Sequence, residues 1–372
     1  MEAYDAELRA EIPEGALLFD AHTHLGDDID GMHAGYDELS ALLDRYGFSG
    51  AFVFCLDEPD REPAFCVPND RTLAHASRSE GKLVPFVRLD LTKGPVEEAK
   101  RALDLGARGI KLHPRAQSFA LDDERLGPIF ELAVERSVPI LIHGGRGLPP
   151  IAAHLETLVR RNAGVRLIVA HAGIADMAGL AGRLGGIPGV FFDTSVWSAV
   201  DLLDLLRQVP PEQIVYASDH PYGRQPNSLL LSIRTARLSG FDDLQLRAML
   251  GENARRIADA EPVPPLTAPR GATSLVQPLT FARIHQYISM AVPMLWMRQR
   301  DGIGALGLAV NASRERNGHE EESERIQELL VTAAELWSEG GELASDDDRV
   351  AAMRRAIQLV SLADMIAVTT RA

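Results

Sequence analysis

A chain of 372 residues with 46% hydrophobic and 24% charged residues has the composition of a globular protein with a large core. Its formal net charge of -15 argues against a general nucleic-acid-binding protein, because phosphate binding needs a basic face. A small anionic substrate is still compatible with this charge, since one site can carry its own arginines. The only cysteines, Cys55 and Cys66, cannot form a disulfide framework for a chain of this size, which favours a reducing compartment.

The sequence also lacks the signals of export and membrane insertion. The first residues contain no basic stretch followed by an apolar one, so we expect no secretory signal. A run of about 18 uncharged apolar residues is absent, so we expect no membrane span. The cytoplasm is therefore the expected location.

Short apolar runs alternate with amphipathic, helix-like segments over the first 260 residues. Buried strands separated by helices pair in parallel, and eight such units in about 250 residues are the proportions of a (β/α)8 TIM barrel. A doubly wound open sheet is the alternative, but the glycine fingerprint that normally follows its first strand is replaced here by residues 25–28, Leu-Gly-Asp-Asp. The predicted strands are 17–25, 50–56, 83–89, 109–113, 139–143, 166–171, 190–194 and 213–218.

The composition changes after residue 260. A proline-rich stretch predicts a linker over residues 261–273, which separates a barrel domain (1–260) from a helical domain (274–372). Helices are expected near 280–300, 320–338 and 346–369, with a shorter one near Leu306, and Pro293 should kink or end the first. Three uses of the helical domain stay open: a packed bundle, a subunit contact in a homo-oligomer, or a lid over the barrel mouth.

Unusual polar residues occur at the ends of the predicted strands. The carboxyl-terminal ends of the strands form the face on which barrel enzymes build their active sites. Residues two apart on a strand point to the same side, so the first two histidines lie together. Three imidazoles and one carboxylate suit zinc or another first-row cation, with one position left for water. The residues are His22 and His24 (first strand), Lys111 and His113 (fourth), His143 (fifth), His171 (sixth) and Asp219 (eighth).

Five of these strand ends carry motifs that resemble those of the amidohydrolase superfamily. The resemblance is closest to amidohydrolase family 2, which contains metal-dependent hydrolases and decarboxylases of the aminocarboxymuconate-semialdehyde type. It covers about residues 15–260, and residues 251–257 resemble the closing helix of that domain. The motifs are Asp-Ala-His-Thr-His (20–24), Gly-Ile-Lys-Leu-His-Pro (109–114), Ile-His-Gly (142–144), Ala-His-Ala-Gly (170–173) and Ala-Ser-Asp-His-Pro (217–221).

The resemblance implies a ligand set and a reaction. His22, His24 and His143 would hold one divalent metal, Asp219 would be a ligand that also moves a proton, and His171 would sit beside the metal. Zn²⁺ is the expected metal, with Mn²⁺ or another first-row cation as alternatives. A metal-activated water would hydrolyse an amide, ester, lactone or activated carbon–carbon bond of a small, carboxylated substrate. Non-oxidative decarboxylation of an unsaturated or aromatic acid is one alternative, and a catalytically silent scaffold or binding protein is another.

The remaining candidates have less specific roles. In binuclear members of the superfamily a lysine at the position of Lys111 is carboxylated and bridges a second metal; here it could instead bind a substrate anion or pair with a carboxylate. His113 could line the pocket or pack in the core. For a substrate carboxylate, Arg146 on the glycine-rich loop after His143 is the first candidate. Arg115 and Arg88 are parallel candidates, and Trp197 could form an apolar wall of the substrate site.

Overall fold

The computed structural model describes residues 2–266, 277–297, 299, 301–315, 318–341 and 345–371. The chain divides into two compact units. One comprises residues 5–196 and 201–271, and the other comprises residues 1–4, 197–200 and 272–372. The second half of the predicted linker, from residue 267, lies outside the described residues, so the domain boundaries at 260 and 274 stay predictions.

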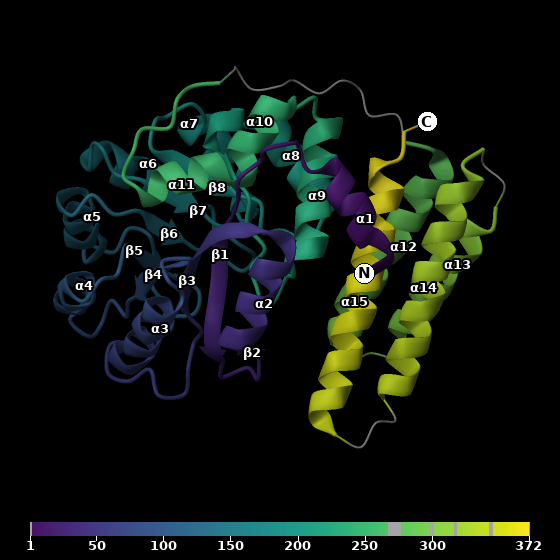
Figure 1. Cartoon of the computed structure of the whole chain (residues 1–372), viewed down its shortest axis with the longest axis horizontal. Helices are drawn as coiled ribbons and strands as arrows, with labels where there is room; N and C mark the ends of the chain where they lie inside the picture. Colours follow the sequence, from purple (N-terminus) through teal and green to yellow (C-terminus); the bar gives the residue numbers. More distant parts are fainter. Residues whose placement is uncertain are drawn as a thin grey trace. The chain divides into compact units, whose positions relative to one another are not determined.

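The first unit contains a curled sheet whose strands follow one another in chain order (Figure 1). Among the described residues, eight strands run parallel, and the short β2 (His33–Ala34) pairs antiparallel with the end of the first. Helices flank the sheet, which confirms the predicted (β/α)8 class. The parallel strands are β1 (Leu18–Asp27), β3 (Phe48–Cys55), β4 (Leu83–Arg88), β5 (Gly109–Leu112), β6 (Ile140–Ile142), β7 (Leu167–Val169), β8 (Val190–Asp193) and β9 (Ile214–Val215).

Hydrogen bonds between β1 and the segment after β9 join the two ends of the sheet. The amide of Ala21 donates to the carbonyl of Tyr216 at 2.9 Å, and the amide of His24 donates to the carbonyl of His220 at 2.8 Å. Thr23 and His220 also form a parallel bridge. These contacts pair the first strand with the chain that follows the last, as a closed barrel requires.

Helices cross between successive strands and cover the outside of the sheet. Each apolar helix stripe packs on the sheet, while charged residues face outward. The crossover helices are α2 (Tyr36–Tyr46), α3 (Cys66–Arg78), α4 (Pro95–Asp104), α5 (Leu126–Glu135), α6 (Ala152–Arg161), α7 (Met177–Leu184) and α8 (Ala199–Gln208). After β9 come α9 (Gln225–Leu238), α10 (Asp243–Arg247), a π-helical turn η3 (Ala248–Glu252) and α11 (Asn253–Ala258). The N-terminal α1 (Glu2–Glu11) was not predicted, because half of its ten residues are charged and it is short of apolar periodicity.

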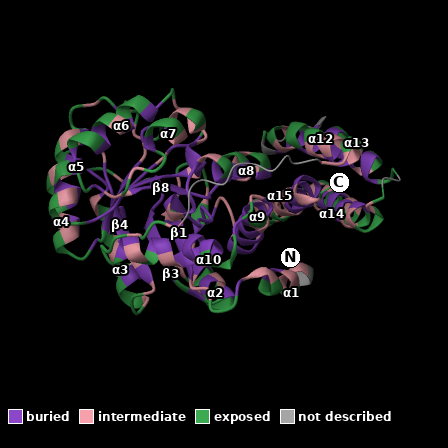
Figure 2. Ribbon diagram, turned by 90° about the horizontal axis from the view of Figure 1, so that it is seen from above, coloured by how far each residue is buried: buried purple, intermediate pink, exposed green. Residues whose placement is uncertain are grey.

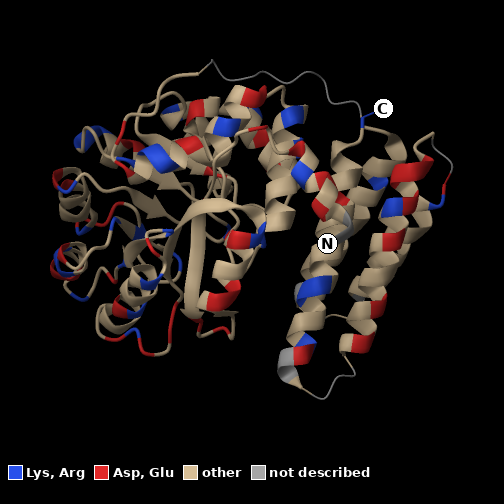
Figure 3. Ribbon diagram, viewed as in Figure 1, with Lys and Arg blue, Asp and Glu red and all other residues tan. Residues whose placement is uncertain are grey.

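Ion pairs link neighbouring helices of the barrel, and Figure 3 shows acidic and basic residues interspersed along these helices. Exposed pairs of this kind each add at most about 1 kcal/mol to the free energy of unfolding, so they make only a small contribution to the stability of the helix packing. Examples are Arg101–Asp70 (2.8 Å, α4 to α3), Arg136–Asp104 (2.8 Å, after α5 to α4) and Arg183–Glu156 (2.7 Å, α7 to α6).

The barrel interior is filled by aromatic side chains. Phe19 and Phe52 have ring centroids 4.9 Å apart, and Phe52 and Phe86 have centroids 4.7 Å apart. The strands are buried almost throughout (Figure 2). Above this layer Phe54 contacts the rings of His22 and His24, with centroids 5.1 and 4.5 Å away. The polar residues at the strand ends therefore pack directly against a layer of apolar side chains.

The second unit is helical, as predicted. α12 (Leu279–Trp296) packs against α13 (Asp301–Ser313) and α15 (Asp346–Thr369), and α14 (Glu320–Gly340) also packs against both of these helices. Pro293 lies within α12, which ends three residues later. In the described part of the chain no helix is long and apolar enough to cross a membrane.

The packing inside the barrel predicts opposite effects for two glycine-to-alanine changes. A Cβ at Gly109 on β5 would lie 2.5 Å from the ring of Phe86, so Gly109→Ala should lower the free energy of unfolding by about 1–3 kcal/mol. Gly182, exposed on α7, has nothing within 4 Å of its Cβ position, so Gly182→Ala should raise it by up to about 1 kcal/mol. Urea unfolding of both variants checks this, and equal stability of the two would contradict it.

Candidate metal centre

Three potential ligand atoms converge at the carboxyl-terminal end of β1. The Nε2 atoms of His22 and His24 are 3.2 Å apart. Oδ1 of Asp219 lies 3.2 Å from the first and 3.3 Å from the second. Ligands held about 2.0–2.2 Å from a tetrahedral zinc are about 3.3–3.6 Å from one another. The three atoms therefore have close to the mutual spacing of ligands that share one cation.

The local backbone explains why these residues meet. His22 and His24 point to one side of β1 because strand side chains alternate. Asp219 follows β9 and has a left-handed backbone (φ 59°), which is uncommon for a residue with a side chain and costs energy. Its amide donates to the carbonyl of His22 at 3.0 Å, which fixes the carboxylate beside the two rings.

The cluster is buried, and burial disfavours the charged form of every group in it. His22 is 0%, His24 5% and Asp219 8% exposed. Burial raises the pKa of Asp219 well above its ordinary value, while Lys111 opposes this shift. Burial also lowers the pKa values of His22 and His24. Neutral imidazoles are the form that binds a metal, and a cation would restore the charged form of the carboxylate.

Asp193, at the end of β8, orients two of the histidines. Its Oδ2 lies 2.8 Å from Nδ1 of His22, a contact that places the ring proton on Nδ1 and leaves Nε2 free to bind a metal. Its Oδ1 accepts hydrogen bonds from the amide of His171 (2.7 Å) and from the hydroxyl of Ser195 (2.6 Å). His22, His171 and Asp193 also form a second group of potential ligands.

Asp193 and Ser195 were missed by the sequence reasoning. The signal was available: an acidic residue directly follows the buried pair Phe191 and Phe192, at the same end of a strand as the other polar residues. The candidates predicted at the strand ends were histidines, a lysine and one aspartate. A carboxylate that accepts a hydrogen bond from a metal-binding imidazole is nevertheless a common partner.

His171 lies next to the three converging atoms. Its Nδ1 is 3.0 Å from the carbonyl of Ser195 and 4.0 Å from Oδ2 of Asp219. The residue has a left-handed backbone (φ 57°) and is partly exposed, so the ring borders the opening of the barrel. The imidazole of His171 therefore lies near Oδ2 of Asp219, the oxygen other than the one that faces His22 and His24.

His143, the fourth predicted ligand, lies beside His171 and outside both groups of converging ligand atoms. Its ring stacks on His113 with centroids 3.9 Å apart and meets His171 edge-on at 4.7 Å. Its Nε2 is buried without a hydrogen-bond partner. Burial, with His171, lowers its pKa to about 2. A Cβ at Gly145 would lie 3.0 Å from this Nε2, so the glycine keeps the space beside the nitrogen open.

Lys111 is completely buried at the edge of the same cluster. Its Nζ is 3.4 Å from Nε2 of His22 and 4.5 Å from the ring centroid of Phe54. Burial lowers its pKa to about 7, while Asp219 acts in the opposite direction. The amine can therefore exist without charge near neutral pH.

The predicted substrate-binding residues are more dispersed. Arg146 and Arg115 are exposed on the loops after β6 and β5. The charge of Arg115 contributes to the lowered pKa of His143, which places it near that ring. His113 is partly exposed and stacked on His143. Trp197 belongs to the second compact unit, and its role as an apolar wall stays a prediction.

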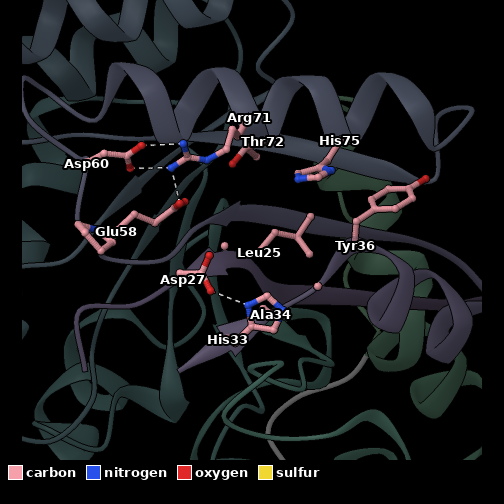
Figure 4. Close-up of a pocket in the computed structure, with 13 residues that line it drawn as sticks. Leu25, Asp27, His33, Ala34, Tyr36, Glu58, Asp60, Arg71, Thr72 and His75 are labelled. Carbon is pink, nitrogen blue, oxygen red and sulfur yellow. Dashed lines mark hydrogen bonds and ion pairs between the residues drawn. The ribbon is translucent and has the colours of Figure 1, made fainter. Parts of the chain in front are cut away.

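A separate pocket of about 560 Å³ lies between the end of β1, β2 and α3 (Figure 4). Its charged residues are paired with one another. Arg71 contacts Asp60 at 2.7 Å and also Glu58, and His33 contacts Asp27 at 2.6 Å. Three carboxylates face one arginine in this lining, so it keeps a net negative charge.

Two histidines of the first barrel strand and an aspartate after the last define a class of metal-dependent barrel enzymes. The amidohydrolase family model matches residues 19–257, and the chain belongs to this family. No curated protein matches the sequence.

Solved structures at low identity share the fold. A probable 2-pyrone-4,6-dicarboxylic acid hydrolase from Acinetobacter baumannii has 13% identity and a TM-score of 0.51, over 65% of this chain and 99% of that one. The 5-carboxyvanillate decarboxylase from Sphingomonas paucimobilis has 16% identity and a TM-score of 0.50, over 66% and 99%. A 5-carboxyvanillate decarboxylase from Novosphingobium aromaticivorans, solved with manganese, has 15% identity and a TM-score of 0.50, over 66% and 97%.

The contact between Asp193 and His22 predicts a loss of metal affinity in Asp193→Asn. Without the carboxylate the His22 ring loses its fixed tautomer, so affinity should fall about 10- to 100-fold. Competition with a chromophoric chelator measures this. Asp176→Asn is the matched control, because Asp176 accepts only backbone amides near α6, at 2.9 and 2.8 Å from Ile151 and Ala152. Unchanged affinity in Asp193→Asn, with circular dichroism showing a native fold, would contradict the assigned role.

Proposed function

We propose that this protein is a metal-dependent hydrolase of a small, carboxylated substrate, with His22, His24, His143 and Asp219 as the ligands of one divalent metal. The convergence of two Nε2 atoms and Oδ1 of Asp219 at 3.2–3.3 Å is the observation that carries the proposal. With the ring proton of His22 on Nδ1, its Nε2 and the carboxylate oxygen of Asp219 both accept hydrogen bonds and do not satisfy one another, whereas a cation would bind both. His143 would supply the fourth ligand through its Nε2, which is buried without a hydrogen-bond partner.

The metal suits the donors present. Imidazole and carboxylate ligands favour Zn²⁺, and they also accept Mn²⁺, the metal bound by the Novosphingobium aromaticivorans decarboxylase. A divalent cation at this site would supply Lewis acidity and bring the pKa of water towards neutrality. A second metal would require carboxylation of Lys111, whose uncharged amine is the form that reacts with carbon dioxide.

Asp219 would move the protons in this reaction. One of its oxygens faces the two imidazoles of β1, and the other lies 4.0 Å from His171. Burial raises the pKa of this carboxyl group, and a bound cation would act in the opposite direction and keep it ionised, the form that can accept a proton. Asp219 would accept the proton of the attacking water and deliver it to the leaving group.

His171 would help to deprotonate the attacking water. Its Nδ1 is engaged by the carbonyl of Ser195, which holds the ring in one orientation. The ring borders the opening of the barrel, where a substrate enters. Because Nδ1 donates to the carbonyl of Ser195, Nε2 of the neutral ring carries the lone pair and can accept a proton from water.

Removal of a ligand predicts the loss of the metal. His22→Ala and His143→Ala should each reduce the metal bound by the purified protein from about one ion per chain to well below stoichiometric amounts. His33→Ala is the matched control, because His33 is exposed and pairs with Asp27 in the separate pocket. Inductively coupled plasma mass spectrometry measures the content. Full metal content in both His22→Ala and His143→Ala would refute the proposed ligand set.

The reaction itself is tested by screening carboxylated lactones, amides and meta-cleavage-type diketo acids for hydrolytic products and for carbon dioxide. Asp219→Asn should lower the rate at least about 100-fold, since general acid–base catalysis contributes that much. Release of carbon dioxide alone would replace hydrolysis by decarboxylation. A wild-type protein without stoichiometric metal, whose properties Asp219→Asn leaves unchanged, would point to a scaffold instead.

A further inference from the structure

Arg88 is a buried guanidinium at the end of β4. It is 2% exposed and is among the largest fully enclosed side chains of the described chain. In the parallel pairing of β4 with β5 it lies opposite Lys111, so the two side chains are neighbours on one side of the sheet. Phe86, two residues earlier, belongs to the aromatic core inside the barrel, so Arg88 also points inward.

The partners of Arg88 do not neutralise its charge. Nη1 donates to the carbonyl of Cys55 at 3.3 Å, and the guanidinium lies 4.9 Å from the ring centroid of Phe65. Nε is buried without a hydrogen-bond partner. Among the described residues no carboxylate lies within 4.0 Å of this guanidinium as an ion-pair partner. Burial raises the pKa of Asp57 and the charges of Arg88 and Arg61 oppose this shift, but the ion pair of Asp57 is with Arg61, at 3.1 Å.

A buried cation without a counter-ion is costly, and arginine cannot escape the cost by losing its proton. Its neighbour Lys111 can do so, because burial lowers the pKa of that amine to about 7. The structure therefore holds a permanent positive charge in the barrel with unfilled hydrogen-bonding capacity. An anion is the group that would satisfy it.

The charge of Arg88 faces the metal centre. Burial lowers the pKa values of His24 and His113, and the charge of Arg88 adds to both shifts. The neighbouring Lys111 reaches to 3.4 Å from Nε2 of His22. Arg88 is therefore on the strand next to that of Lys111, with β3 between it and the histidines of β1, at the face of the barrel where a substrate is bound.

We propose that Arg88 binds a carboxylate of the substrate. This inference rests on the proposed function, because it assumes that the reacting bond lies at the metal centre. A guanidinium pairs with a carboxylate through two parallel hydrogen bonds, and burial strengthens them. Arg146 and Arg115 are exposed, so their pairs with an anion would be screened by water. The substrate class is accordingly an acid with a carboxylate separate from the bond that reacts.

The test uses the metal-loaded protein with isophthalate as the probe and its neutral diamide as the uncharged analogue. Isothermal titration calorimetry should show that wild type binds isophthalate more tightly than the diamide. Arg88→Met should weaken isophthalate binding about 10- to 100-fold, the loss expected for hydrogen bonds to a charged group. Arg88→Lys should recover part of the affinity that Arg88→Met loses. Arg160→Met is the matched control, because Arg160 is exposed on α6 and pairs with Glu156, and this variant should bind isophthalate as wild type does.

A second measurement separates ligand binding from a structural role. Without ligand, Arg88→Met should unfold at the same or a higher temperature than wild type, because replacing a buried unpaired charge by an apolar side chain does not cost stability. Isophthalate should raise the unfolding temperature of wild type but not of Arg88→Met. Failure of Arg88→Met to fold, wild-type affinity in this variant, or equal binding of isophthalate and the diamide by wild type would overturn the proposal. Metal content, measured alongside, reports separately on the proposed function.

Discussion

The hydrogen bonding between β1 and the segment after β9 is the constraint on which the site depends. His22 and Asp219 are far apart in the sequence, yet the same backbone contacts that join the two ends of the sheet set the distance between their side chains. A shift of one residue in this pairing would turn Asp219 to the other face and disperse the ligands. Assembly of the metal centre and completion of the barrel are therefore one event.

Burial gives the centre its chemistry as well as its shape. Each group in it is pushed towards its uncharged form, and the surrounding contacts then select what each group can do. Asp193 leaves one nitrogen of His22 free, and the backbone at Ser195 holds His171. The left-handed backbones of His171 and Asp219 show that the fold supports unfavourable local conformations where the functional groups lie.

The barrel could be predicted because its strands are apolar runs that end in unusual polar residues, and this regularity is local in the sequence. The short β2 and the charged α1 carry no such signal. The gathering of His22, His24 and Asp219 followed from strand ends alone. The contact of Asp193 with His22 did not, because it depends on the side-chain direction at β8. Burial was equally hidden, so the exposed Arg146 and the enclosed Arg88 looked alike.

The aromatic layer of Phe19, Phe52, Phe54 and Phe86 has an evolutionary consequence. It seals the barrel beneath the histidines, so a substrate can reach the ligands only from the loop side. Changes in loop length or sequence can then alter which molecules enter while the strands that hold the ligands stay as they are. The loops determine which substrate enters, and the strands determine the stability of the barrel. The sequences of the loops can therefore diverge faster than those of the strands.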